Sequence, residues 1–326
     1  MQSVSEVQGA ITAGQSLFLA GSRQALSSLP RGNWIGGTIS YFMTDEGGQM
    51  SEDRIFVTPV PEFALSVEAA DYSAAEIARI YQDAPEQGVT FLVAPASTKV
   101  HKNFAEQAPT CDGFLLKPVV GWVAGVRVDR IGRDKPAVFN GKSGAVLEDR
   151  CVAFHVALPA NKMADIDIVN IFESGGGDVI HFEDASFSVG RCRIGNKQVN
   201  LADYVESHNI HTELPLVGDY NGTSVNVSFQ RVDSITHTVD FYAPVFPGVD
   251  YHFAKPVESY EGAFARQIVA GDDASPDFAC NCILNYLYGG LEGKKTGGIT
   301  GPITFGEIGH QLLNQTLVRL YIRDIG

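Results

Sequence analysis

The chain has 326 residues, 44% of them hydrophobic and 19% charged, which provides for a substantial core and argues against global disorder. Its formal net charge of −14 argues against nucleic acid or an anionic membrane surface as partner, because both bind clustered Lys and Arg. With no apolar run of the roughly 18 residues that span a membrane, and five scattered Cys, we expect a cytoplasmic protein without membrane insertion or disulfides.

Strand and helix signals alternate over the first 110 residues. β-branched and aromatic residues predict strands at 17–20, 32–42, 54–60 and 89–94. A short helix is expected after the first strand, and another from Ser73, where Glu76 completes a capping box. Ser97 is predicted to open a further helix. This alternation predicts helices packed on a sheet.

Strand signals dominate from residue 114 onward. The first three strands are predicted at 114–128, 137–140 and 145–157, with an Asn-Gly hairpin at Asn140. A polar interruption at 159–165 is the predicted boundary between two domains, 1–160 and 161–326.

The second domain is predicted to be rich in strands. Its strands are expected within 166–172, 179–189, 223–232 and 234–243. Helix signals are confined to 201–207 and to the second part of 278–287, whose first part reads as a strand. We therefore predict an α+β or mixed α/β fold, with helices on mixed sheets and a β-rich second half.

A glycine-rich stretch near the C-terminus precedes a buried strand predicted at 317–322. Glycines at this density suit turns and the close approach of another backbone or a ligand. Glu307 follows Gly306 directly, so its carboxylate is placed to meet the amine of a small ligand, or to cap a backbone turn. If Gly306 makes a turn, Thr304 and Glu307 can lie on the same side of a cleft walled by residues 34–41.

Segment 304–308, followed by 314–317, resembles the closing motif of FIST domains, which are small-ligand sensor modules. Residues 35–38 resemble the Gly-Gly/Cys-Thr-Thr strand of the amino-terminal FIST half. Cys282 lies where many members have Cys-x-x-Arg, although Asn285 replaces the Arg. The resemblance implies a FIST N-like domain over 1–160 and a FIST C-like domain over 161–326.

The resemblance also implies a function. We expect a cytoplasmic, bacterial-type sensory or signal transduction module that binds an amino acid or related metabolite, signals through a separate protein, and uses no cofactor. Its ligand-binding residues are expected to be Trp34, Gly36, Gly37, Thr38, Tyr41, Cys282, Asn285, Thr304, Gly306 and Glu307.

Two alternatives to a sensor stay open. One is a cysteine-dependent hydrolase or transferase that uses Cys282 with His310 and Glu307, although the apolar neighbours of Cys282 favour an inert, buried thiol. The other is an assembly module without a ligand. For metal, Cys280 with Cys282, or His208 with His211, are the candidate pairs, and we expect neither to bind one.

Overall fold

A computed structural model describes residues 1–220, 222–269 and 275–325 of the chain. The fold is mixed α+β and rich in strand, with 18% helix and 43% strand, so the predicted fold class is confirmed at this level. Within the described ranges no helix combines the length and the apolar character needed to cross a bilayer.

The first sheet is built from the amino-terminal 60 residues and a later hairpin. Its strands, in order, are β1 (Gln2–Ser3), β6 (Arg54–Pro59), β2 (Leu17–Gly21), β3 (Trp34–Thr38), β10 (Val138–Asn140) and β11 (Ala145–Leu147). Strands β2 and β3 run parallel. Because side chains alternate along a strand, Leu17 and Leu19 face helices α1 (Val4–Thr12) and α2 (Arg23–Ser27), whereas Phe18 packs on the other face.

The second sheet combines strands from both halves of the chain. Its strands, in order, are β26 (Gln311–Leu313), β25 (Glu307–Gly309), β9 (Val119–Ala124), β8 (Gly88–Pro95), β12 (Cys151–Ala157) and β7 (Ser66–Tyr72). Strands β8 and β9 run parallel. Helices α3 (Ile77–Gln82) and α4 (Lys99–Gln107) cover its outer face, and the 3₁₀ turn Ala108–Thr110 follows α4.

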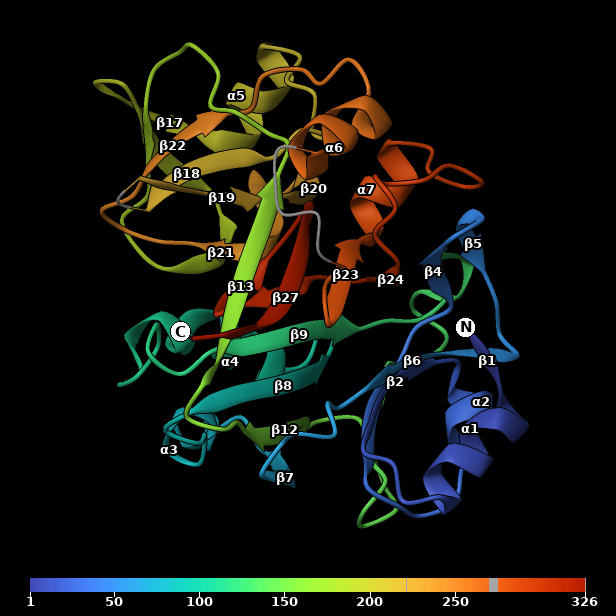
Figure 1. Ribbon diagram of the computed structural model, residues 1–326. Helices are drawn as coiled ribbons and strands as arrows, with labels where there is room; N and C mark the ends of the chain where they lie inside the picture. Colours follow the sequence, from blue (N-terminus) through green and yellow to red (C-terminus); the bar gives the residue numbers. More distant parts are fainter. Residues whose placement is uncertain (221, 270–274, 326) are drawn as a thin grey trace.

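The two sheets pack face to face between these helix pairs. Figure 1 shows the resulting order of layers, from α1 and α2 through β2 and β8 to α3 and α4. The core between the sheets includes Phe18 from β2 and Trp122 from β9, whose ring centroids lie 4.3 Å apart. A Cβ at Gly37 would lie 2.5 Å from a methyl of Val93, so a glycine is required for this approach.

A third sheet also crosses the middle of the sequence. Its strands, in order, are β13 (Lys162–Asn170), β27 (Thr316–Asp324), β23 (Phe278–Cys282), β24 (Gly301–Thr304), β4 (Tyr41–Thr44) and β5 (Gly47–Met50). Strand β24 pairs with β4, as β25 pairs with β9. The two segments on either side of the predicted boundary at residue 160 are therefore joined by backbone hydrogen bonds, because strands of 1–160 and of 161–326 pair within two of the sheets.

Most of residues 180–253 form a separate β-rich layer with its own apolar core (Figure 1). One sheet has the order β17 (Lys197–Asn200), β16 (Arg191–Ile194), β14 (Ile180–His181), β22 (Asp250–Phe253), β18 (Leu216–Tyr220), β19 (Thr223–Val227). A smaller sheet holds β15 (Ser186–Val189), β21 (Thr238–Val245) and β20 (Phe229–Asp233). The remaining helices are α5 (Leu201–Ser207), α6 (Tyr260–Val269) and α7 (Ile283–Tyr288).

Several predicted elements are confirmed, among them strands at 17–20, 54–60 and 89–94, helix 201–207, and the strand followed by a helix at 278–287. The strand predicted over 114–128 is wrong in extent: β9 begins at Val119, because a turn closed by Lys117 N–H on Gly113 O comes before Pro118. The helix predicted from Ser97 begins two residues later, at Lys99.

Other errors concern where strands break. The strand predicted over 145–157 is two strands, β11 and β12, and the one over 179–189 is likewise β14 and β15. The polar stretch 159–165 follows the end of β12 at Ala157, but only its first residues lie between strands, because β13 begins inside it at Lys162 and pairs with β27. Its polar residues suit an edge strand that is partly exposed to solvent.

Candidate functional site

The carboxyl group of Glu307 is sealed inside the protein. Its side chain is 0% exposed, and Oε2 accepts hydrogen bonds from the backbone N–H of Thr316 (3.2 Å) and its hydroxyl (2.9 Å). Burial raises the pKa of Glu307 from its usual 4.5 to about 8, although hydrogen bonds from Thr316, Cys282 and Thr304 oppose the shift. The group is therefore mostly neutral at pH 7 and is poorly suited to anchor an amine.

Four other predicted site residues lie around Glu307 and are buried with it. Asn285 donates to Asn281 Oδ1 (3.0 Å) and to the carbonyl of Thr316 (3.3 Å). The Thr304 hydroxyl donates to the carbonyl of Gly306 (3.1 Å). The structure thus brings Cys282, Asn285, Thr304, Gly306 and Glu307 together, as predicted, but as an internal hydrogen-bonded cluster.

Cys282 lies at the end of β23, directly before α7. It is fully buried, and this burial, together with the nearby Glu307 carboxyl group, raises the pKa of its thiol well above the usual value. Because the thiolate is the nucleophile, such a cysteine is unreactive in this conformation. Across the described residues no three His, Cys, Asp or Glu side chains gather as metal ligands.

The amino-terminal candidates divide into packing and positioning residues. The Trp34 indole N–H donates to the carbonyl of Pro30 (2.8 Å), and its ring belongs to the core beneath the first helix pair. Gly36 and Gly37 permit the close approach of protein atoms, namely Leu19 O and the Val93 side chain. Thr38, in contrast, lines a cavity at the end of β3.

This cavity, which we term the charged cleft, has a volume of about 600 Å³. It lies where β2, β3 and β9 end, at Ser22, Thr38 and Gly125. The carboxyl ends of parallel strands form the usual ligand crevice of open α/β sheets. Here the Gly125 N–H donates to the Thr38 carbonyl (2.8 Å), which joins the ends of the two packed sheets.

A loop of residues 127–136 forms one wall of the charged cleft, and both of its ends are anchored by predicted site residues. The Val128 N–H, in the 3₁₀ turn Val128–Arg130, donates to the Tyr41 hydroxyl (3.0 Å). Just after the loop, the Ala137 N–H donates to the Thr38 hydroxyl oxygen (3.0 Å). Thr38 and Tyr41 therefore position the loop, and Thr38 also lines the cavity.

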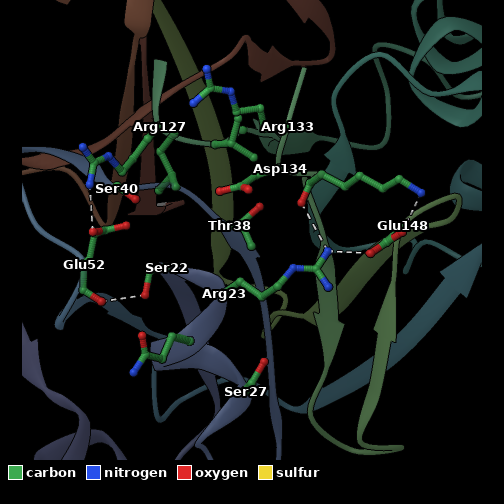
Figure 2. A pocket seen from close by; sticks show the side chains of 15 residues that line it. Ser22, Arg23, Ser27, Thr38, Ser40, Glu52, Arg127, Arg133, Asp134 and Glu148 are labelled. Carbon is green, nitrogen blue, oxygen red and sulfur yellow. Dashed lines mark hydrogen bonds and ion pairs between the residues drawn. The ribbon is translucent and has the colours of Figure 1, made fainter. Parts of the chain in front are cut away.

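Seven charged side chains line the charged cleft: Arg23, Arg127, Arg133, Lys135, Glu52, Asp134 and Glu148. Figure 2 shows Thr38 and Asp134 near its middle, with the Arg127–Glu52 pair on one side and the Arg23–Glu148 pair on the other. The Arg23 guanidinium lies 2.6 Å from Glu148 and lowers the pKa of that carboxyl group. Four cationic and three anionic groups therefore face one cavity at neutral pH.

Arg133 and Asp134 differ from the other charged side chains of this lining. In the described part of the chain, neither side chain makes a hydrogen bond or an ion pair with another residue. They are adjacent in the loop and carry opposite charges, so they are available to a ligand that carries both. A group with a carboxylate and an amine matches this arrangement.

Sequence reasoning missed these charged residues, although one signal was present. Four of the 24 basic residues of an acidic chain fall within nine positions, 127–135. This local cluster follows a strand and was not recognised as a basic patch. The ligand site was predicted at the glycine-rich stretch 297–306 instead. In the structure, those glycines lie in turns or at close contacts with neighbouring chain segments.

The fold and the cleft define a β-rich α+β protein with a cavity lined by charged side chains at the ends of two packed sheets. Residues 2–323 match a family described as a family of unknown function (DUF6976), and the chain belongs to that family. No curated protein matches the chain.

Proposed function

We propose that the protein is a small-molecule-binding sensory module whose ligand carries a carboxylate and an amine and binds in the charged cleft. The single observation that carries the proposal is that two oppositely charged side chains, Arg133 and Asp134, line a cavity of about 600 Å³ and have no partner within residues 1–220, 222–269 and 275–325. This volume lies within the range of about 300–1,000 Å³ typical of small-molecule sites.

The proposal keeps the amino acid or related metabolite implied by the FIST resemblance and moves its site. Burial and a pKa of about 8 argue against Glu307 as the group that binds the amine. The Asp134 carboxylate is exposed, and Arg133 beside it supplies the complementary cation for a ligand carboxylate. A signal would pass to a separate protein through the 127–136 loop, which contributes both residues.

The cysteine-dependent enzyme is the weaker alternative. Its nucleophile would be Cys282, whose burial and raised pKa oppose thiolate formation. An assembly module without a ligand gives no reason for the opposite charges of Arg133 and Asp134 in the cleft. We therefore place ligand binding first.

Titration calorimetry with a panel of amino acids tests the proposal. We expect the wild-type protein to bind at least one, and Arg133→Gln and Asp134→Asn each to weaken that binding by about tenfold, because each removes one charge-assisted hydrogen bond. Arg191→Gln and Asp184→Asn are matched controls at exposed positions outside the cleft, and should bind as the wild type does. Wild-type affinity in both cleft variants, or no binding by any amino acid, would overturn the proposal.

A further inference from the structure

A second cavity of about 870 Å³ adjoins the charged cleft. The two share four lining residues, Val126, Asp134, Lys135 and Glu148. Because the same side chains border both spaces, the cavities are neighbouring compartments of one larger site. We term the second one the apolar compartment.

The apolar compartment owes its character to side chains from three segments. Ile131 of the 127–136 loop is 60% exposed, and Val146 of β11 is 45% exposed. Phe305 adds an aromatic ring that packs on Gly125, where a Cβ would lie 2.2 Å from the ring. Exposed apolar side chains gathered at one cavity are typical of a binding site.

The turn that borders this compartment is also strained. Ser97, between β8 and α4, has a φ of 60°, in the left-handed region that side chains other than glycine rarely adopt. Its neighbour Thr98 caps α4 by accepting from the His101 N–H and donates its own hydroxyl to the Pro95 carbonyl (2.7 Å). Backbone strain of this kind is found preferentially at functional sites.

From these observations we propose that the ligand is amphipathic: a zwitterionic head binds in the charged cleft, and a hydrocarbon or aromatic side chain occupies the apolar compartment. The inference rests on the proposed function, because the head group fixes the ligand at Arg133 and Asp134. The class it names is α-amino acids with long apolar side chains. Short or polar amino acids would leave Ile131, Val146 and Phe305 in contact with water.

A homologous series tests the inference directly. The affinity of the wild-type protein is measured by titration calorimetry for alanine, norvaline, norleucine and 2-aminooctanoate. We expect the affinity to rise roughly twofold to fourfold for each added methylene, as the side chain leaves water. Ile131→Ser removes apolar surface from the compartment at an exposed position, so the variant should fold and show a flatter dependence on chain length. Ile235→Ser is the matched control, since Ile235 is 90% exposed and does not line either cavity.

The outcomes separate the inference from the proposed function. Binding of all four amino acids with equal affinity would overturn the inference and leave the charged cleft as the site. Binding of the unsubstituted fatty acids of the same length, equally well and with the same sensitivity to Ile131→Ser, would support the apolar compartment and overturn the amine requirement. Binding of none of these compounds would overturn both. If the gain in affinity per added methylene is the same in Ile131→Ser, in Ile235→Ser and in the wild type, the assignment of the side chain to this compartment is overturned.

Discussion

Two polar regions adjoin strand β9 and differ in their access to water. The Glu307 cluster lies beside the middle of the strand, where Glu307 pairs with Trp122 in the sheet, and its side chains are buried. The charged cleft opens where the same strand ends at Gly125. In the first region the protein supplies two hydrogen bonds to Glu307 Oε2, whereas in the second the side chains of Arg133 and Asp134 have no partner among the described residues.

This difference shows how the two regions use polar groups. A buried carboxyl group is tolerated because its pKa rises and hydrogen bonds hold it, so it contributes to the specificity of the core. Charges at a solvent-filled cavity contribute little to stability and are free to recognise a ligand. The comparison therefore predicts that stability depends on the Glu307 cluster and ligand binding on the charged cleft.

The largest expected effect is that of Glu307→Ala on stability. The variant leaves the backbone N–H and hydroxyl of Thr316 buried without their acceptor, so we expect a loss of about 3 kcal/mol in the free energy of unfolding. Urea denaturation followed by circular dichroism measures it. Both variants are compared with the wild type below about pH 4.5, where the carboxyl group is protonated in the folded and the unfolded chain alike; there Glu307→Gln keeps an acceptor oxygen and should cost about 1 kcal/mol. An alanine variant with the wild-type midpoint would show that the cluster does not depend on this carboxyl group.

The pH dependence of stability sharpens the same point. Folded Glu307 keeps its proton up to its raised pKa of about 8, whereas in the unfolded chain the group loses it near 4.5. The stabilisation is therefore complete below about pH 4.5 and is lost as the pH rises towards 8, by up to about 1.4 kcal/mol for each pH unit. Relative to Glu307→Gln, the wild type should lose stability between pH 5 and pH 8. Parallel profiles for the two proteins would contradict the raised pKa.

The smallest expected effect concerns the stability of the cleft variants. Arg133→Gln and Asp134→Asn remove exposed side chains without partners in the described chain, so each should change the free energy of unfolding by less than about 0.5 kcal/mol. The same urea experiment measures this, with Arg191→Gln as control. A loss of more than about 1 kcal/mol would mean that the charges hold the 127–136 loop in place, and would remove the contrast between the two regions.

Much of the local structure follows from residue patterns that act over short distances. The apolar runs of β2 and β8 can be recognised in the sequence because each strand depends on its own side chains. The close packing at Gly36 and Gly37 was also predicted, since paired glycines in a strand mark the approach of other atoms. Strand ends were less predictable. In the apolar run 114–128, for example, a turn followed by Pro118 delays the start of the strand to Val119.

The sequence also grouped Cys282, Asn285, Thr304, Gly306 and Glu307 correctly, through the resemblance that links their segments. It did not determine whether that group faces a ligand or the interior, because exposure depends on the strands packed around it. Strand β25 carries Glu307 and lies between β26 and β9, from opposite halves of the chain, and this pairing contributes to the burial of the cluster.

By itself, the sequence determined the fold class, the β-rich second half, most strands and helices, and the acidic character that argues against nucleic acid as partner. Only the tertiary structure decided the site. Arg23, Glu52, Arg133 and Glu148 are separated by up to 125 residues and line one cavity, because the segments after β2, β5, β9 and β11 meet at one edge of the packed sheets. No local pattern encodes such a meeting, since it depends on which strands pair and which sheet faces pack together.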